Sequence, residues 1–172
     1  MRRPTAKLVA FAVLVGTLAA AGTAAASGLS GARSATAGFH KLARGQAADY
    51  TAKVVDVNGI SCIAEAGEGT MGVHWLNPGL LDDSISATSP ELLVYEPRAH
   101  GKPRLVALEY LMIKSVWDAS HSSPPRLFGH EFMVTEGGNR FGLPAFYSLH
   151  AWIWKHNPSG TFAMWNPNVH CP

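Results

Sequence analysis

The chain has 172 residues, of which 47% are hydrophobic and 15% are charged, and its formal net charge is +2. A chain of this length can bury one hydrophobic core of ordinary size. Three of the basic residues, Arg2, Arg3 and Lys7, lie at the amino terminus, and without them 11 basic residues remain against 12 acidic ones. This balance excludes the basic surface that binding to nucleic acid or to an anionic membrane requires.

Residues 1–26 have the pattern of a secretory signal peptide. The basic residues precede an apolar stretch from Leu8 to Ala21, and Ala24-Ala25-Ala26 matches a small-residue cleavage site. The alternative is an uncleaved anchor, but the Ala- and Gly-rich end of the apolar stretch makes a poor membrane span. The sequence therefore predicts a secreted protein, extracellular or in the cell envelope, with no membrane association after cleavage.

The two cysteines, Cys62 and Cys171, are both in the predicted mature part of the chain. Two cysteines in an exported protein most simply form one disulfide bond. This bond would tie the carboxyl-terminal tail to the early part of the domain. A thiolate metal ligand is the weaker alternative, because the sequence contains no CxxC motif.

Residues 27–32 are rich in Gly and Ser and are predicted to be a flexible spacer, followed by a single globular domain at 33–172. The segment 34–50 is predicted to be a helix, because its apolar positions recur at helical spacing. Two glycines within it, one of them Gly45, favour close packing of this helix against a sheet.

Several apolar and β-branched runs, bounded by turn residues, are predicted to be strands. The clearest antiparallel hairpin joins 91–96 to 104–114, and Asn58-Gly59 predicts a second one between 53–57 and 60–64. No alternation of strands and helices is present. These features predict an α+β fold: an antiparallel, strongly twisted sheet or partly closed β-barrel with one N-terminal helix packed on it. The remaining predicted strands are 71–76, 132–135 and 147–155.

Two motifs occur in incomplete form. The run from Gly67 to Gly72 matches GxGxxG, but Asn77-Pro78 soon afterwards prevents the long helix that a dinucleotide site needs, which excludes a nucleotide cofactor. The run beginning at His130-Glu131 starts like HExxH, but the second histidine of a zinc-protease helix is absent. The sequence thus contains no motif that identifies a reaction.

Three predicted strands each carry one polar residue among apolar neighbours: His74, Glu109 and His150. Alternation along a strand puts Glu109 on the same face as Leu105 and Leu111, so its carboxylate is expected to be buried. A buried carboxylate must be paired, neutral or bound to a metal. Two histidines and one carboxylate form the ligand set of many sites for a divalent transition metal (Zn, Fe or Cu).

His40 and His130 are candidates for an additional ligand or a proton carrier at this site. The alternative is that the histidines and the glutamate form a metal-free hydrogen-bonded network in the core. A second class of function is the binding of a small molecule in an apolar pocket. Its predicted wall is formed by Trp75, Trp152 and Trp154.

The chain resembles a group of small exported proteins of actinobacteria and proteobacteria over nearly all of its predicted mature part. The resemblance implies export and a single domain, and it implies no particular activity. It places the two candidate histidine ligands and the glutamate inside segments typical of the group. Those segments are ATAGFH, MGVHWLNPGLL, PELLVYEP, LVALEY, LFGHEF and LHAWIWKHNPSGTFAMWNPNVHCP.

Overall fold

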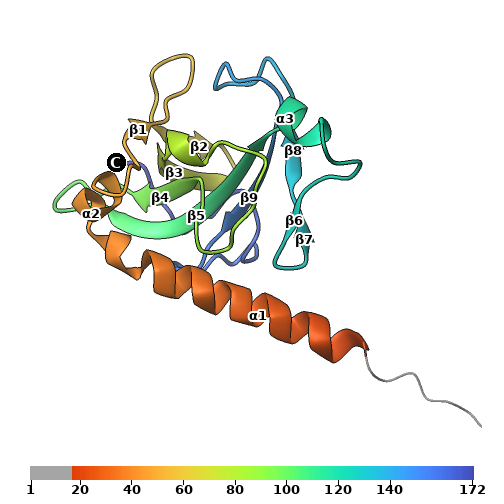
Figure 1. Cartoon of the computed structure of the whole chain (residues 1–172). Helices are drawn as coiled ribbons and strands as arrows, with labels where there is room; N and C mark the ends of the chain where they lie inside the picture. Colours follow the sequence, from red (N-terminus) through yellow and green to blue (C-terminus); the bar gives the residue numbers. More distant parts are fainter. Residues whose placement is uncertain (1–16) are drawn as a thin grey trace, which may run out of the picture.

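The computed structural model describes the backbone from Thr17 to Pro172 and the side chains from Ala25 onward. It has an α+β fold, in which an N-terminal helix packs on an antiparallel sheet, as predicted (Figure 1). The predicted signal peptide, residues 1–26, lies largely outside the described residues. No helix among the described residues has both the length and the apolar character needed to cross a membrane.

The N-terminal helical region is longer than predicted and begins earlier. It consists of α1 (Thr17–Thr36), a 3-10 turn η1 (Ala37–His40) and α2 (Leu42–Gln46). The predicted spacer at 27–32 is instead part of α1. Its Gly and Ser residues have low helix propensity, so the helix here depends on its contacts with the body of the protein. Ala32 is fully buried, and the Arg33 guanidinium donates hydrogen bonds of 3.0 and 2.7 Å to the carbonyl of Ile153.

Seven strands form the main sheet, and their order is β1-β3-β4-β5-β9-β8, with β2 also paired to β3. Every pairing is antiparallel. The sheet is not closed into a barrel. Its strands are β1 (Ala52–Lys53), β2 (Cys62–Glu65), β3 (Gly69–Leu76), β4 (Leu92–Glu96), β5 (Arg104–Ile113), β8 (Met133–Thr135) and β9 (Phe146–Ala151).

Four short elements after β3 lie outside this sheet. The turn η2 (Pro78–Leu80) follows β3, the helix α3 (Lys114–Asp118) follows β5, and β6 (Arg126–Leu127) pairs with β7 (His130–Glu131) in a two-stranded sheet. The predicted hairpin of β4 and β5 is confirmed.

The predicted hairpin around Asn58-Gly59 is wrong, because β1 and β2 both pair with β3 and not with each other. The Asp56 carboxylate accepts hydrogen bonds from the backbone N–H groups of Asn58 and Ile60, both at 2.9 Å. This side-chain capping stabilises an independent loop in place of a two-residue turn.

The two faces of the sheet have different coverings. One face packs against α1, which runs beneath the sheet in Figure 1, and against α2 at its left end. This face carries the largest core cluster, including Leu93, Leu108 and Tyr110. Gly45 of α2 comes so close to this face that a Cβ atom there would lie 2.9 Å from Leu93 Cδ1, which confirms the predicted close packing. The other face carries Leu92, Leu111 and Phe146, together with the three candidate ligands.

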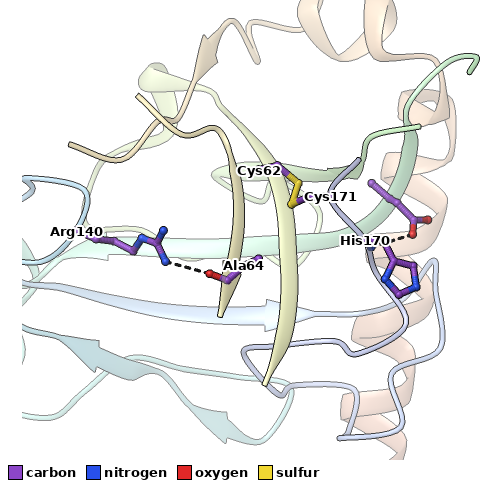
Figure 2. The surroundings of a disulfide bond; sticks show 6 residues. Cys62, Ala64, Arg140, His170 and Cys171 are labelled. Atoms are coloured by element: carbon purple, nitrogen blue, oxygen red, sulfur yellow. Dashed lines mark hydrogen bonds between the residues drawn. A yellow bond between two sulfur atoms is a disulfide. The ribbon is translucent and has the colours of Figure 1, made fainter. Parts of the chain in front are cut away.

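The C-terminal tail covers part of this second face. The disulfide between Cys62 and Cys171 is present as predicted, and it joins β2 to the end of the tail (Figure 2). Within the tail, Asn157 Nδ2 donates to the carbonyl of Trp165 at 2.9 Å, and the backbone of Asn166 pairs with Thr70 at the start of β3. The disulfide and these hydrogen bonds fix the tail against the sheet.

Candidate metal site

Each of the three candidate ligands comes from a different strand of the sheet. His74 is on β3, Glu109 on β5 and His150 on β9. Glu109 and His150 are direct cross-strand partners, whereas β4 separates β3 from β5. In a flat sheet β3 and β9 would be about 14 Å apart. Because the two imidazoles are in contact, the sheet must curl around the face that carries the three ligands, which is called the curled face below. The expected twist of antiparallel strands permits this.

The ligand atoms converge on one point. His74 Nε2 lies 3.3 Å from His150 Nε2 and 3.4 Å from Glu109 Oε2. His150 Nδ1 lies 3.9 Å from Glu109 Oε1, and one ligand atom from each of the three residues falls within 4.8 Å of the others. Two ligands that are each about 2.0–2.1 Å from a tetrahedral ion lie about 3.3 Å apart. Two edges of the triangle therefore already have the length that a tetrahedral metal site requires.

The site is buried, and burial sets the protonation of its members. His74 and His150 are 3% and 1% exposed, and burial lowers the pKa of each imidazole to about 4. Burial also raises the pKa of the Glu109 carboxyl, against the opposing effects of His74 and of a hydrogen bond from Ser148. Both imidazoles are therefore neutral at neutral pH, which is the form that binds a metal.

Hydrogen bonds within the protein leave this group incomplete. Nδ1 of His74 and Nδ1 of His150 are buried, and neither makes a hydrogen bond of standard geometry, although the backbone of Gly72 is close enough to the His74 ring to act against the lowering of its pKa. A buried polar atom without a partner costs about 1–3 kcal/mol. The contact between the two Nε2 atoms therefore leaves the network of polar groups unsatisfied.

A cavity of about 340 Å³ opens beside His74 and Glu109. The loop at 136–145 and the tail residues Met164 and Trp165 contribute to its wall. This loop is held in place by Arg140, whose guanidinium contacts the Asp56 carboxylate at 3.0 Å. It also donates a hydrogen bond of 3.3 Å to the carbonyl of Ala64, which Figure 2 shows. Two of the three candidate ligands, His74 and Glu109, thus border a preformed space large enough for a small molecule.

The two additional histidines predicted for the site lie elsewhere. His40 is exposed at the end of η1, where its ring contacts Trp154 with 4.4 Å between centroids. His130 is exposed on β7 and contacts Phe162 at 4.1 Å. Neither joins the triad of His74, Glu109 and His150, because each is on an element that does not contribute to the curled face of the sheet.

The predicted tryptophan wall is also not where the sequence placed it. Trp75 and Trp154 pack against the helix-covered core, and Trp152 stacks on the ring of His150 with 5.9 Å between centroids. None of the three lines the cavity, whereas Trp165 does. Alternation fails beyond Ala151 because β9 ends there, and the chain then turns Trp154 toward Thr36 of α1.

Sequence reasoning missed the residues that loops contribute to the site. Arg140 belongs to a segment without regular periodicity, so no pattern signals its position. Ser148 follows from the strand pattern, because it is two residues before His150 and therefore shares its face.

Comparison of the chain with models of protein families, with curated proteins and with solved structures finds no match.

Proposed function

We propose that this protein is an exported domain that binds one divalent transition metal ion through His74, Glu109 and His150. The observation that carries the proposal is the convergence of three buried ligand atoms, two of whose separations are 3.3 and 3.4 Å, beside a cavity. Three protein ligands with a fourth position left for water or a small molecule are typical of functional, as opposed to purely structural, metal sites.

The donor set supports zinc, iron or copper. Two imidazoles and one carboxylate suit these metals better than magnesium or calcium, which prefer oxygen ligands alone. A positive ion would also favour the ionised form of Glu109, whose burial otherwise favours the protonated form. When bound, such a metal supplies a Lewis acid that can polarise a ligand or activate water.

The residues of the chain would determine access to the ion. The loop held by Arg140 and the tail held by the disulfide border the cavity, so a ligand must approach between them. Trp152 stacks on His150 and limits the rotation of its ring.

A second candidate function is favoured by the contact between the two Nε2 atoms, which at 3.3 Å is itself a hydrogen bond. In this alternative the triad is a structural network and the cavity alone binds a small molecule. The alternative needs one imidazole nitrogen to donate and the other to accept, with no metal between them.

Metal content distinguishes the two candidates. The protein would be purified without an affinity tag, dialysed against Zn²⁺ and then against metal-free buffer, and analysed for bound zinc. We expect close to one zinc per chain in the wild type, and a loss of most of it in His74→Gln and His150→Gln. His156→Gln, at an exposed histidine, is the matched control and should retain the metal.

Circular dichroism and urea unfolding would show that each variant is folded before its metal content is compared. Folded wild-type protein without bound zinc, iron or copper would contradict the metal site and leave the hydrogen-bonded network. Export is tested separately by the mass of the protein recovered outside the cell. Cleavage after Ala26 would remove the first part of α1 but keep the contact between Arg33 and Ile153.

A further inference from the structure

We infer that the cavity beside the triad binds a neutral, largely apolar small molecule with a single electron-pair donor atom that reaches the metal position. The part of this inference that concerns the cavity stands on its own, whereas the part that concerns the donor atom rests on the proposed metal site. The distribution of polar groups around the cavity wall carries the argument.

Most of the wall is aliphatic or aromatic, and it comes from six strands, the three loop segments around Val54, Leu81 and Phe141, and the tail. The volume of about 340 Å³ is at the lower end of the range of small-molecule sites, which excludes large substrates such as polymers from the interior. The apolar residues of the wall are Val54, Met71, Leu76, Leu81, Leu92, Leu111, Ile113, Phe141, Leu143, Phe146, Met164 and Trp165.

The polar groups at the more exposed part of the wall are already paired with each other. Arg140 contacts the carboxylates of Asp56 at 3.0 Å and Glu65 at 3.9 Å, so its charge is balanced. The Asn139 side chain donates to the carbonyls of Glu136 and Leu143 and accepts from the backbone N–H of Phe141. These groups shape the loop and offer a charged ligand no unpaired partner.

The deeply buried polar groups of the wall are His74, Glu109 and Ser148, which are 3%, 7% and 2% exposed. They lie together, so a ligand that fills the apolar part of the cavity meets polar chemistry at one end only. In the metal-free cavity the only cationic side chain that the described residues contribute to the wall, Arg140, is already paired, so an anion buried there would be uncompensated, and a cation would compete with the metal for the same atoms. A neutral donor, such as an imidazole nitrogen or an alcohol oxygen, fits this end.

The cavity is tested first on metal-free protein, with n-alkanols from butanol to octanol as probes and isothermal titration calorimetry as the measurement. Each added methylene should strengthen binding about 3- to 4-fold until the cavity is full, because each is buried from water. The corresponding n-alkanoates should bind at least about 10-fold more weakly than alkanols of the same length. Binding that does not depend on chain length, or alkanoates that bind more tightly, would overturn the inference.

A blocking variant ties this binding to the cavity. Leu143→Trp enlarges a side chain that lines the cavity but is 37% exposed, so the protein can fold around it. Val116→Trp makes the same enlargement at a 45% exposed position of α3 outside the cavity. We expect Leu143→Trp to weaken hexanol binding about 10-fold or more and Val116→Trp to leave it unchanged. Equal effects of the two variants would show that the probe binds elsewhere.

The donor atom is tested on zinc-loaded protein with 1-butylimidazole and 1-butylpyrrole, which have nearly the same shape. Only the imidazole has a nitrogen lone pair for the metal. We expect 1-butylimidazole to bind at least about 10-fold more tightly than 1-butylpyrrole to the loaded protein, and the preference to disappear in metal-free protein. Equal binding by the loaded protein would overturn the donor part of the inference. A failure of the metal site itself is recognised separately, by the absence of bound zinc.

Discussion

The two faces of the central sheet bury polar groups in opposite ways. On the helix-covered face, the hydroxyls of Tyr50, Tyr95 and Tyr110 all donate to backbone carbonyls at 2.7–2.8 Å. On the curled face, the Nδ1 atoms of His74 and His150 are buried without a hydrogen bond of standard geometry. The comparison teaches that polar groups in a core are not equivalent: the tyrosine hydroxyls are satisfied within the fold, whereas the two histidine rings leave part of their hydrogen-bonding capacity unused.

The two faces also differ in what their side chains can do chemically. The tyrosines reach past the apolar core to Pro90, Phe39 and Ala87 and thereby connect loops and helices to the sheet. The histidines and Glu109 point at one another, and His74 and Glu109 border a cavity. Four changes test this contrast, and they are given from the largest expected effect to the smallest.

Acid should destabilise the metal-free protein because the two histidines of the curled face are buried in their neutral form. The folded pKa of His74 and of His150 is lowered to about 4, below the value of about 6.5 expected for an unfolded chain. The unfolded state therefore binds protons first as the pH falls, and stability is lost between pH 6.5 and 4. The loss is on the order of 3 kcal/mol per imidazole.

Urea unfolding at pH 7, 5.5 and 4 in the presence of a chelator would measure this loss. The double variant His74→Gln/His150→Gln isolates it from the carboxyl groups, because both proteins contain them. The raised pKa values of Glu91 and Glu109 act in the opposite direction, and the lowered pKa values of the aspartates act in the same direction. If the wild type and the double variant lose stability in parallel, the two imidazoles are not buried in the neutral form.

Leu108→Ala should destabilise the protein through the helix-covered face without changing metal binding. Leu108 is fully buried in the larger core cluster and is not in the cavity wall. Removing its side chain should lower the free energy of unfolding by about 2–5 kcal/mol, because a cavity remains. Unfolding by urea measures the effect, and zinc content should remain close to that of the wild type. A loss of zinc from folded Leu108→Ala protein would show that the two faces are not independent.

Glu91→Gln should stabilise the protein above pH 7. Burial raises the pKa of the Glu91 carboxyl to about 8, and its Oε2 accepts a hydrogen bond of 3.0 Å from the backbone N–H of Leu111. Since the folded pKa is raised, stability is lost as the pH rises from about 4.5 to 8. An amide can accept the same hydrogen bond without becoming charged, so we expect a gain of about 1–3 kcal/mol at pH 8.

The gain from Glu91→Gln should be small at pH 4.5, where the wild-type carboxyl is protonated in the folded state. Thermal unfolding at the two pH values measures the difference. A variant that is equally stabilised at both would contradict the titration of Glu91.

Arg126→Ala should have the smallest effect, because the contact that it removes lies in the β6–β7 hairpin, away from both faces of the central sheet. The guanidinium lies 3.1 Å from the Glu131 carboxylate, and both side chains are more than half exposed. Exposed ion pairs of this kind contribute about 0–1 kcal/mol. We expect the free energy of unfolding to stay within about 0.5 kcal/mol of the wild-type value. The zinc content should equal that of the wild type within the error of measurement. A larger change in either would mean that the β6–β7 hairpin supports the curled face.

Periodicity along strands was enough to predict much of the site, because the side chains of a strand alternate between two faces. The pairing of β4 with β5 and the burial of Glu109 and His150 follow from this rule. The rule fails at Leu105, which was predicted to share the face of Glu109. A register shift puts Leu105 opposite Tyr95 and Ala107 opposite Val94, so Leu105 lies in the helix-covered core.

Long-range geometry could not be read from the sequence. No local pattern shows that the sheet curls until His74 on β3 reaches His150 on β9, across two intervening strands. Gly72 contributes to this part of the sheet: with φ of 108°, it comes so close to β4 that a Cβ would lie 2.6 Å from the Tyr95 carbonyl oxygen. A glycine near a strand's histidine is a sequence signal of close approach, but not of which strand it approaches.

The most direct test of the central claim is the location of the metal in crystals of the zinc-loaded protein, from diffraction data measured on both sides of the zinc absorption edge. The account predicts one anomalous peak within about 2.0–2.2 Å of His74 Nε2, a Glu109 carboxylate oxygen and a ring nitrogen of His150. It would be contradicted by a direct hydrogen bond between the two histidines with no peak between them, or by a peak only at exposed histidines such as His40 or His156.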